Sequence, residues 1–130
     1  MIRIPVENRG RGAAYIVAAP VVPGKEEAWR RFLQEVADSR AEYERLRAQL
    51  GMRRGSLWLV PMARGYVSVA YLEVEEDIDR LVRHLADTAE DFGLWFKAGI
   101  AECHGLTGAT RFSLRPAFEP LLSWGEVSKS

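Results

Sequence analysis

Hydrophobic and polar positions alternate along the chain in patterns that predict strands and amphipathic helices. Residues 13–19 are apolar at every position, which is typical of a central strand in a sheet that is covered on both faces. Between Gly24 and Gly51, hydrophobic residues recur at spacings of three, four or seven. That spacing predicts one amphipathic helix of about seven turns. Its apolar stripe consists of Trp29, Phe32, Leu33, Val36, Tyr43, Leu46 and Leu50.

Two runs rich in β-branched and aromatic residues follow, at 56–62 and 66–74. The link between them is short and contains Gly65, so they are predicted to form a hairpin. A second helical pattern comes next and slips at residues 88–91, which indicates a kink or two consecutive helices. A last strand is expected within residues 111–124, where two prolines leave its limits open.

The predicted order of elements, β-α-β-β-α-β, indicates an α+β fold of the ferredoxin-like type with an antiparallel sheet. The 130 residues are expected to form a single domain, since this length suffices for one hydrophobic core. Residues 1–12 are interpreted as an N-terminal arm or a short edge strand. Residues 106–130 are interpreted as a partly irregular C-terminal segment.

The hairpin carries the prediction of a homodimer. An even loop places Trp58 opposite Val69 and Leu57 opposite Ala70. One face then bears Leu57, Leu59, Ser68, Ala70 and Leu72, and the other bears Trp58, Val60, Val67, Val69, Tyr71 and Glu73. The first face is small enough for helices to pack on it. The second is bulky and apolar, so we expect a second copy of the chain to cover it and to close a barrel across the dimer.

Several short motifs resemble those of a known family. They are 22–26 (VPGKE), 50–51 (LG), 92–96 (FGLWF), 102–105 (ECHG) and 119–124 (EPLLSW). Together they are similar to an uncharacterised bacterial family within the dimeric α+β barrel superfamily, whose members have a ferredoxin-like fold. The resemblance implies a homodimer and no particular reaction. The wider superfamily includes cofactor-free monooxygenases, haem-degrading enzymes and isomerases, so the fold alone does not define the function.

Charge and composition exclude several classes of protein. Eighteen basic and eighteen acidic residues cancel, so no field attracts nucleic acid or an anionic membrane. The longest apolar run, at 13–22, is too short to cross a bilayer. The single cysteine, Cys103, fits a reducing compartment. We therefore expect a cytoplasmic protein whose partners are a second copy of itself and a small molecule, with no nucleic acid and no membrane.

Two residues are candidates for catalysis. His104, at the predicted end of the second helical region, is either a general base or haem ligand, or a cation that caps the last carbonyls. Glu73 continues the alternation of Val67, Val69 and Tyr71. It either points into the barrel as a base, or ends the strand in water or in a pair with Arg53 or Arg54.

Trp58, Tyr71 and Trp95 are candidates for lining a cavity, with packing in the core or interface as the alternative. Two histidines and one cysteine are too few for a closed metal site, so neither a metal nor another cofactor is expected. Two functions remain open. One is binding of a small apolar ligand in the barrel. The other is cofactor-independent catalysis, as a monooxygenase or isomerase, on an aromatic or polyketide-like substrate.

Overall fold

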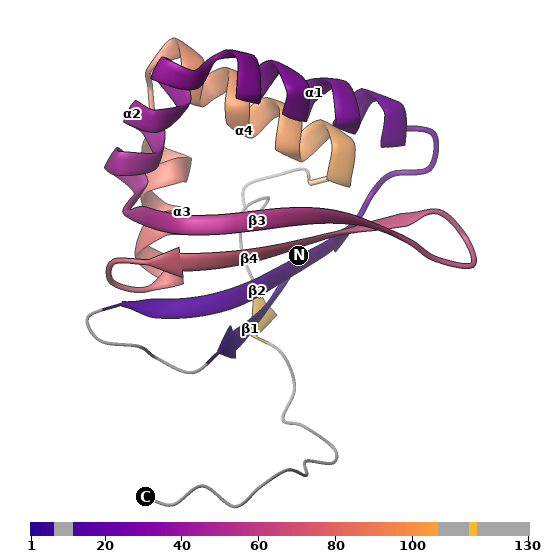
Figure 1. Ribbon diagram of the computed structural model, residues 1–130, viewed down its shortest axis with the longest axis horizontal. Coiled ribbons are helices and arrows are strands. Elements are labelled where there is room, and N and C mark those ends of the chain that lie inside the picture. Colours follow the sequence, from indigo (N-terminus) through magenta and orange to yellow (C-terminus); the bar gives the residue numbers. More distant parts are fainter. Residues whose placement is uncertain (7–11, 107–114, 117–130) are drawn as a thin grey trace, which may run out of the picture.

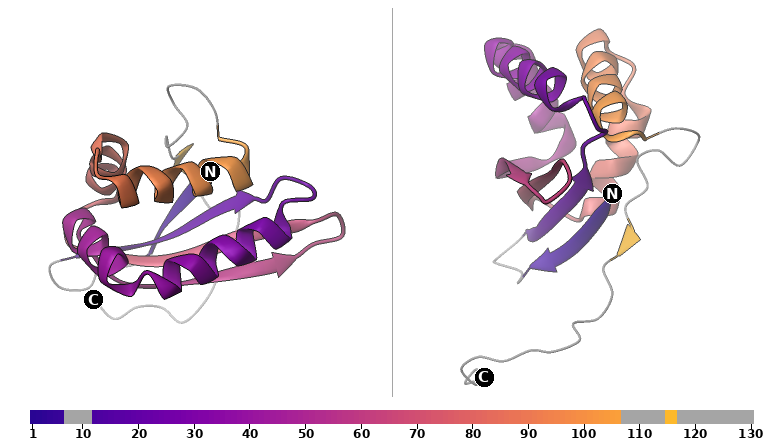
Figure 2. Two further views of the ribbon diagram at one scale, coloured as in Figure 1. Left: turned by 90° about the horizontal axis from the view of Figure 1, so that it is seen from above. Right: turned by 90° about the vertical axis from the view of Figure 1, so that its right-hand side faces the viewer.

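The computed structural model describes residues 1–6, 12–106 and 115–116, and over these residues the fold is α+β. The described helices all lie on one face of a single sheet (Figure 1), and the turned views show the same two layers (Figure 2). In chain order the elements are β1 (Ile2–Val6), β2 (Ala13–Pro20), α1 (Glu26–Asp38), α2 (Arg40–Leu50), β3 (Met52–Pro61), β4 (Tyr66–Val74), α3 (Ile78–Asp87), α4 (Asp91–His104) and β5 (Arg115–Pro116).

The sheet has the strand order β3-β4-β2-β1-β5. All neighbours are antiparallel except β1 and β5, which are parallel. Residues 2–6 of the predicted arm therefore form a strand, and this strand pairs with β2 on the side away from β4. The described part of the expected last strand is only Arg115–Pro116, which pairs beyond β1. The rest of the segment 111–124 lies outside the described residues.

The predicted register of the hairpin is confirmed. Leu57 pairs with Ala70 and Trp58 with Val69. Directly opposed residues point to the same side of a sheet. The residues that the sequence assigned to each face of the hairpin therefore do lie on one side of the sheet. Ser68 is hydrogen-bonded to His104 of α4, so the face with Ser68 meets the helices. The opposite face, here called the open sheet face, carries Ile2, Ile4, Ile16, Trp58, Val67, Val69, Tyr71 and Glu73.

The long first helix predicted from the sequence is wrong in one respect: it is two helices, α1 and α2, which meet at Ser39. Ser39 leaves helical geometry, with φ −96° and ψ 49°, and its N–H closes α1 on the carbonyls of Glu35 and Val36. Between Val36 and Tyr43 the sequence has no large apolar residue, so no core contact holds that turn in a straight helix. The predicted break after the hairpin is confirmed, because α3 ends at Asp87 and α4 begins at Asp91.

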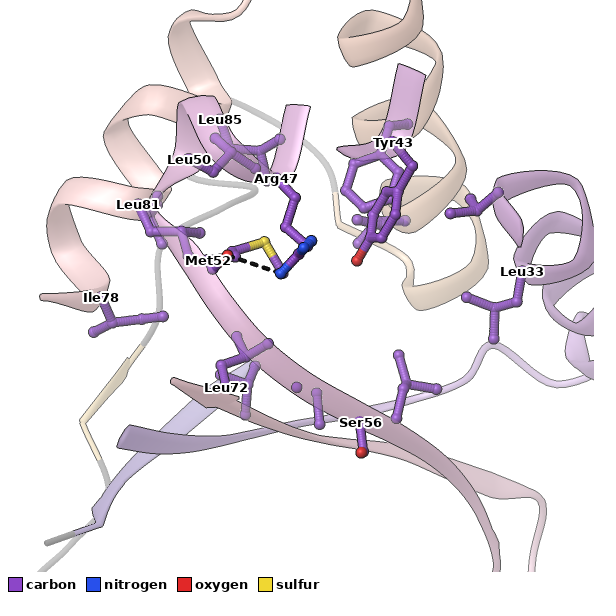
Figure 3. A pocket seen from close by; sticks show the side chains of 18 of the residues that line it. Leu33, Tyr43, Arg47, Leu50, Met52, Ser56, Leu72, Ile78, Leu81 and Leu85 are labelled. Atoms are coloured by element: carbon purple, nitrogen blue, oxygen red, sulfur yellow. Dashed lines mark hydrogen bonds between the residues drawn. The ribbon is translucent and has the colours of Figure 1, made fainter. Parts of the chain in front are cut away.

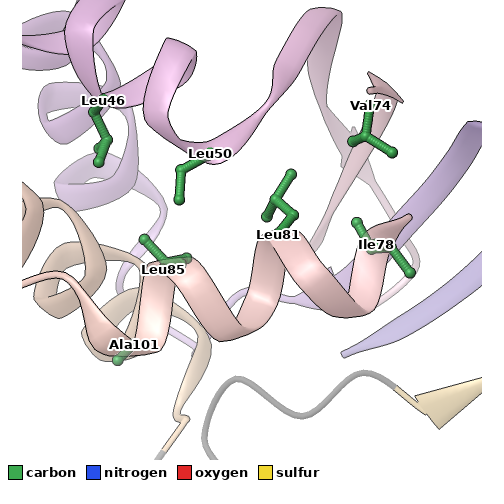
Figure 4. Packing of buried hydrophobic residues seen from close by; sticks show 7 residues of the cluster. All are labelled: Leu46, Leu50, Val74, Ile78, Leu81, Leu85 and Ala101. Atoms are coloured by element: carbon green, nitrogen blue, oxygen red, sulfur yellow. The ribbon is translucent and has the colours of Figure 1, made fainter. Parts of the chain in front are cut away.

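Two groups of buried side chains join the helices to the sheet. The first brings together side chains from α2, β4, α3 and α4 (Figure 4); it contains Leu46, Leu50, Val74, Ile78, Leu81, Leu85 and Ala101. The second contains Val21, Trp29, Phe32, Val36 and Cys103. Here α4 approaches α1 so closely that a Cβ atom on Gly99 would overlap the Phe32 ring. Only glycine permits this distance between the two helices.

A buried lysine connects the last two helices. Lys97 of α4 is 6% exposed, and its Nζ donates to the carbonyl oxygens of Ala86 at 2.7 Å and Thr88 at 3.2 Å. These carbonyls lie at the C-terminal end of α3, where helical partners are missing. The ammonium group therefore caps α3 from a neighbouring helix. Within the described ranges, no helix combines the length and apolar character needed to cross a membrane.

Candidate functional site

A cavity of about 500 Å³ lies between the helices and the sheet. Residues from each of the helices α1 to α4 border it on one side, and residues of β2, β3 and β4 border it on the other. Figure 3 shows side chains from α2, α3 and β3 converging on this space. Leu57 of β3 lines the cavity and is 41% exposed. Because β3 is an edge strand of the sheet, the cavity opens to solvent along that edge.

The lining is mostly aliphatic and aromatic, with Leu33 and Val36 from α1, Leu72 from β4, and Phe96 and Ile100 from α4 among its members. Such a lining favours apolar surface over water. The size is within the range of about 300–1,000 Å³ that is usual for small-molecule sites. The cavity is therefore suited to a compact hydrophobic molecule.

Tyr43 supplies a polar group to this apolar space. Its hydroxyl points into the cavity from α2 (Figure 3), and it has no hydrogen-bond partner among the described residues. Burial raises the pKa of Tyr43, although the nearby Arg47 charge opposes the shift. The hydroxyl is thus protonated at neutral pH and is able to donate a hydrogen bond.

Arg47 lies one helical turn after Tyr43 and ties α2 to the beginning of β3. Its Nη1 donates to the carbonyl oxygens of Met52 at 3.1 Å and Arg53 at 2.9 Å, where the β3–β4 register shifts. Its Nη2 donates to Glu44 Oε2 at 2.7 Å. This hydrogen bond raises the pKa of Arg47 and lowers the pKa of Glu44. The guanidinium group therefore connects α2 to the start of β3, and the carboxylate of Glu44 neutralises its charge.

Trp29 lies at the α1 side of the cavity lining and is only 2% exposed. Its ring stacks on Phe32 with a centroid distance of 5.4 Å, and it meets the His104 ring edge-on at 4.5 Å. The indole Nε1 is buried and has no hydrogen-bond partner among the described residues. An unpaired buried donor of this kind is uncommon in a folded protein.

His104, the first catalytic candidate, lies behind Trp29 and does not line the cavity. Its Nδ1 is 2.8 Å from the Ile100 carbonyl oxygen, which can only accept, so Nδ1 carries the proton. In the neutral ring, Nε2, which lies 2.8 Å from Ser68 Oγ, accepts from that hydroxyl. Burial lowers the pKa of His104. The contact with a late carbonyl that one interpretation expected is present, and burial favours the neutral imidazole over the cation of that interpretation.

Glu73, the second candidate, lies on the open sheet face, on the other side of the sheet from the cavity. Its Oε2 accepts a hydrogen bond from the Tyr71 hydroxyl at 2.9 Å and is 3.7 Å from Arg54 Nε. One interpretation of the sequence was that Glu73 pairs with Arg53 or Arg54, and the structure shows the pair with Arg54. Trp58, on the same face, is 53% exposed.

Trp95 lies on α4 against Phe32, with a centroid distance of 4.7 Å, and against Phe92 at 5.4 Å. Like Trp58 and Tyr71, it is not among the residues that line the cavity. The structure does not bring these three aromatic residues together. A role for Trp58 and Tyr71 in lining a barrel between two copies stays a prediction.

Sequence reasoning missed Tyr43 and Arg47 as site residues. The sequence did contain a signal for both residues. Tyr43 and Arg47 are four residues apart, so they share one face of a helix, and a tyrosine in an apolar stripe brings a hydroxyl group to that face. The spacing assigned Tyr43 to the core, and Arg47 was one of many charged residues on the helix.

The chemistry available in the cavity is hydrogen bonding within an apolar lining. No carboxylate or imidazole is among the described residues that line it. Over the described ranges, no group of three or more His, Cys, Asp or Glu side chains is placed to hold a metal ion. Comparisons with protein families, with curated proteins and with solved structures found no match to this chain.

Proposed function

We propose that the protein binds a small apolar molecule in the cavity between its helices and its sheet. The observation that carries the proposal is the cavity of about 500 Å³, which has a hydrophobic lining and a mouth at Leu57. A closed core would fill such a space with side chains, because protein interiors pack as densely as organic crystals. A ligand would bury the exposed apolar lining and gain free energy by doing so.

Cofactor-independent catalysis, as a monooxygenase or isomerase on an aromatic or polyketide-like substrate, is the alternative function. It needs a base that reaches the bound substrate. His104 is engaged with Ser68 behind Trp29, and Glu73 lies on the opposite side of the sheet. The described lining of the cavity favours binding over this alternative.

A titration with the neutral fluorescent probe N-phenylnaphthylamine tests the proposal. We expect saturable binding of one probe per chain. Leu57→Arg places a charge at the mouth and should weaken binding at least about tenfold, because a charge is costly next to an apolar ligand. Leu94→Arg is the control, since Leu94 is also exposed but does not line the cavity. Unsaturable binding, or equal loss in both variants, would contradict the proposal.

We also propose that the chain is a homodimer of the dimeric α+β barrel type, with a ferredoxin-like protomer, as its resemblance to that bacterial family implies. The support is the open sheet face, on which the large apolar residues Ile2, Ile4 and Trp58 are exposed. A face of this kind on a single chain favours association. Pairing two such faces around a twofold axis would bury them together.

A cytoplasmic location completes the proposal. It rests on the free thiol of Cys103, which is buried in the second core cluster. Burial also raises the pKa of this thiol, so it stays protonated and unreactive. Fractionation of cells that produce the protein, with an antibody to it, tests the location.

A further inference from the structure

We propose that the ligand of this cavity is an uncharged molecule that presents an oxygen acceptor, such as a ketone or quinone carbonyl, to Tyr43. This inference rests on the proposed function and adds the chemical class of the ligand. It follows from two features of the lining, namely hydrogen-bond donors that have no acceptor among the described residues and the positions of its arginine side chains.

The donors are Tyr43 and Trp29. The Tyr43 hydroxyl points into the cavity (Figure 3), and no described residue pairs with it. The indole N–H of Trp29, in the same lining, is buried and equally unpaired within the described ranges. An indole only donates, and Tyr43, which is half-buried and has a raised pKa, keeps its proton. A ligand oxygen would therefore satisfy a donor for which the described residues provide no partner.

The arginines argue for a neutral ligand. Three of them, Arg47, Arg53 and Arg54, border the cavity. Arg47 is held by Glu44 and by two carbonyls, and Arg54 is 3.7 Å from Glu73 on the open sheet face.

The third arginine, Arg53, also reaches a place outside the cavity. Its Nη1 lies beside Gly12, 3.5 Å from where a Cβ atom would stand there, and its side chain borders a separate small depression with Tyr71 and Glu73. A carboxylate next to Tyr43 would thus lose its hydration beside arginines of which two are already paired and the third extends toward Gly12, and such a loss is costly.

Three rigid probes of one shape test the inference: fluorene, fluorenone and fluorene carboxylate. Fluorenone differs from fluorene by its carbonyl oxygen, and the carboxylate adds a charge. Binding of each to wild type and to Tyr43→Phe is measured by equilibrium dialysis. The substitution removes a hydroxyl without a described partner, so the variant should keep the unfolding transition of wild type, which urea titration checks.

We expect wild type to bind fluorenone about tenfold more tightly than fluorene, as one added hydrogen bond allows. This preference should vanish in Tyr43→Phe, while fluorene affinity stays the same. Equal affinity of wild type for fluorene and fluorenone, or tightest binding of the carboxylate, would overturn the inference and leave the proposed function standing. If no probe binds, the proposed function and the inference both fail.

Discussion

Ser68 Oγ lies 2.8 Å from His104 Nε2, and this hydrogen bond joins strand β4 to the last turn of α4. The imidazole donates from Nδ1 to the Ile100 carbonyl, and burial favours its neutral form, in which Nε2 accepts from the serine. Protonation would place a charge beside the Trp29 ring in a half-buried site. Burial at this contact therefore favours the neutral form of His104.

Stability should fall as the pH is lowered through the ordinary histidine pKa of 6.5, because burial lowers the pKa of His104 in the folded state. In that range the unfolded chain binds more protons than the folded chain, so the free energy of unfolding rises with pH and falls with acid. The loss should level off below the folded-state pKa. Urea unfolding at pH 7.5 and pH 5.5 measures it.

His104→Gln should remove this part of the pH dependence, whereas His84→Gln, at an exposed position of α3, should retain it. An equal slope in wild type and His104→Gln would show that His104 does not carry the effect.

Lys97→Met should destabilise the fold by about 1–3 kcal/mol, because the Ala86 and Thr88 carbonyls lose their donor. Lys25→Met is the matched control. Lys25 pairs with Glu102 at 3.0 Å near the surface, and such a pair is worth about 0–1 kcal/mol. Chemical denaturation of both variants compares them. A loss at Lys97 no larger than that at Lys25 would mean that water replaces the ammonium group without cost.

Val69→Lys should separate the proposed dimer, since Val69 lies opposite Trp58 on the open sheet face and an unpaired ammonium in a dry interface is costly. Light scattering should give twice the chain mass of 14.7 kDa for wild type and the mass of one chain for the variant. Glu27→Lys, at an exposed position of α1, should remain a dimer. A dimer that survives Val69→Lys would place the interface elsewhere.

The sequence predicted local structure well where one pattern decided it. In the hairpin, the alternation of side chains and the even loop were enough to predict that Trp58 pairs with Val69. A register shift of one residue would have moved the side chains of each face to the other side of the sheet. The break at residues 88–91 followed from the loss of helical spacing. The break at Ser39 could not be predicted in this way. The helical spacing of apolar residues continues in phase from Val36 to Tyr43, so the pattern looks like one helix.

Long-range arrangement was harder to predict. The alternation of Ile2, Ile4 and Val6 indicates a strand, but nothing local says that it pairs with β2 rather than lying at the margin as an arm. The cavity was also invisible to sequence patterns. Spacing shows that Leu33 and Tyr43 face inward, but not whether the inward side chains meet or leave a space between them.

The most direct test of ligand binding in the cavity uses the indole N–H signals of the four tryptophans in an NMR titration with fluorenone. Single Trp→Phe variants assign the signals. Trp29 lines the cavity, whereas Trp58 lies on the open sheet face. We predict that fluorenone shifts the Trp29 signal and leaves the Trp58 signal in place. A shift of Trp58 with an unchanged Trp29 would contradict the account and place the ligand against the open sheet face.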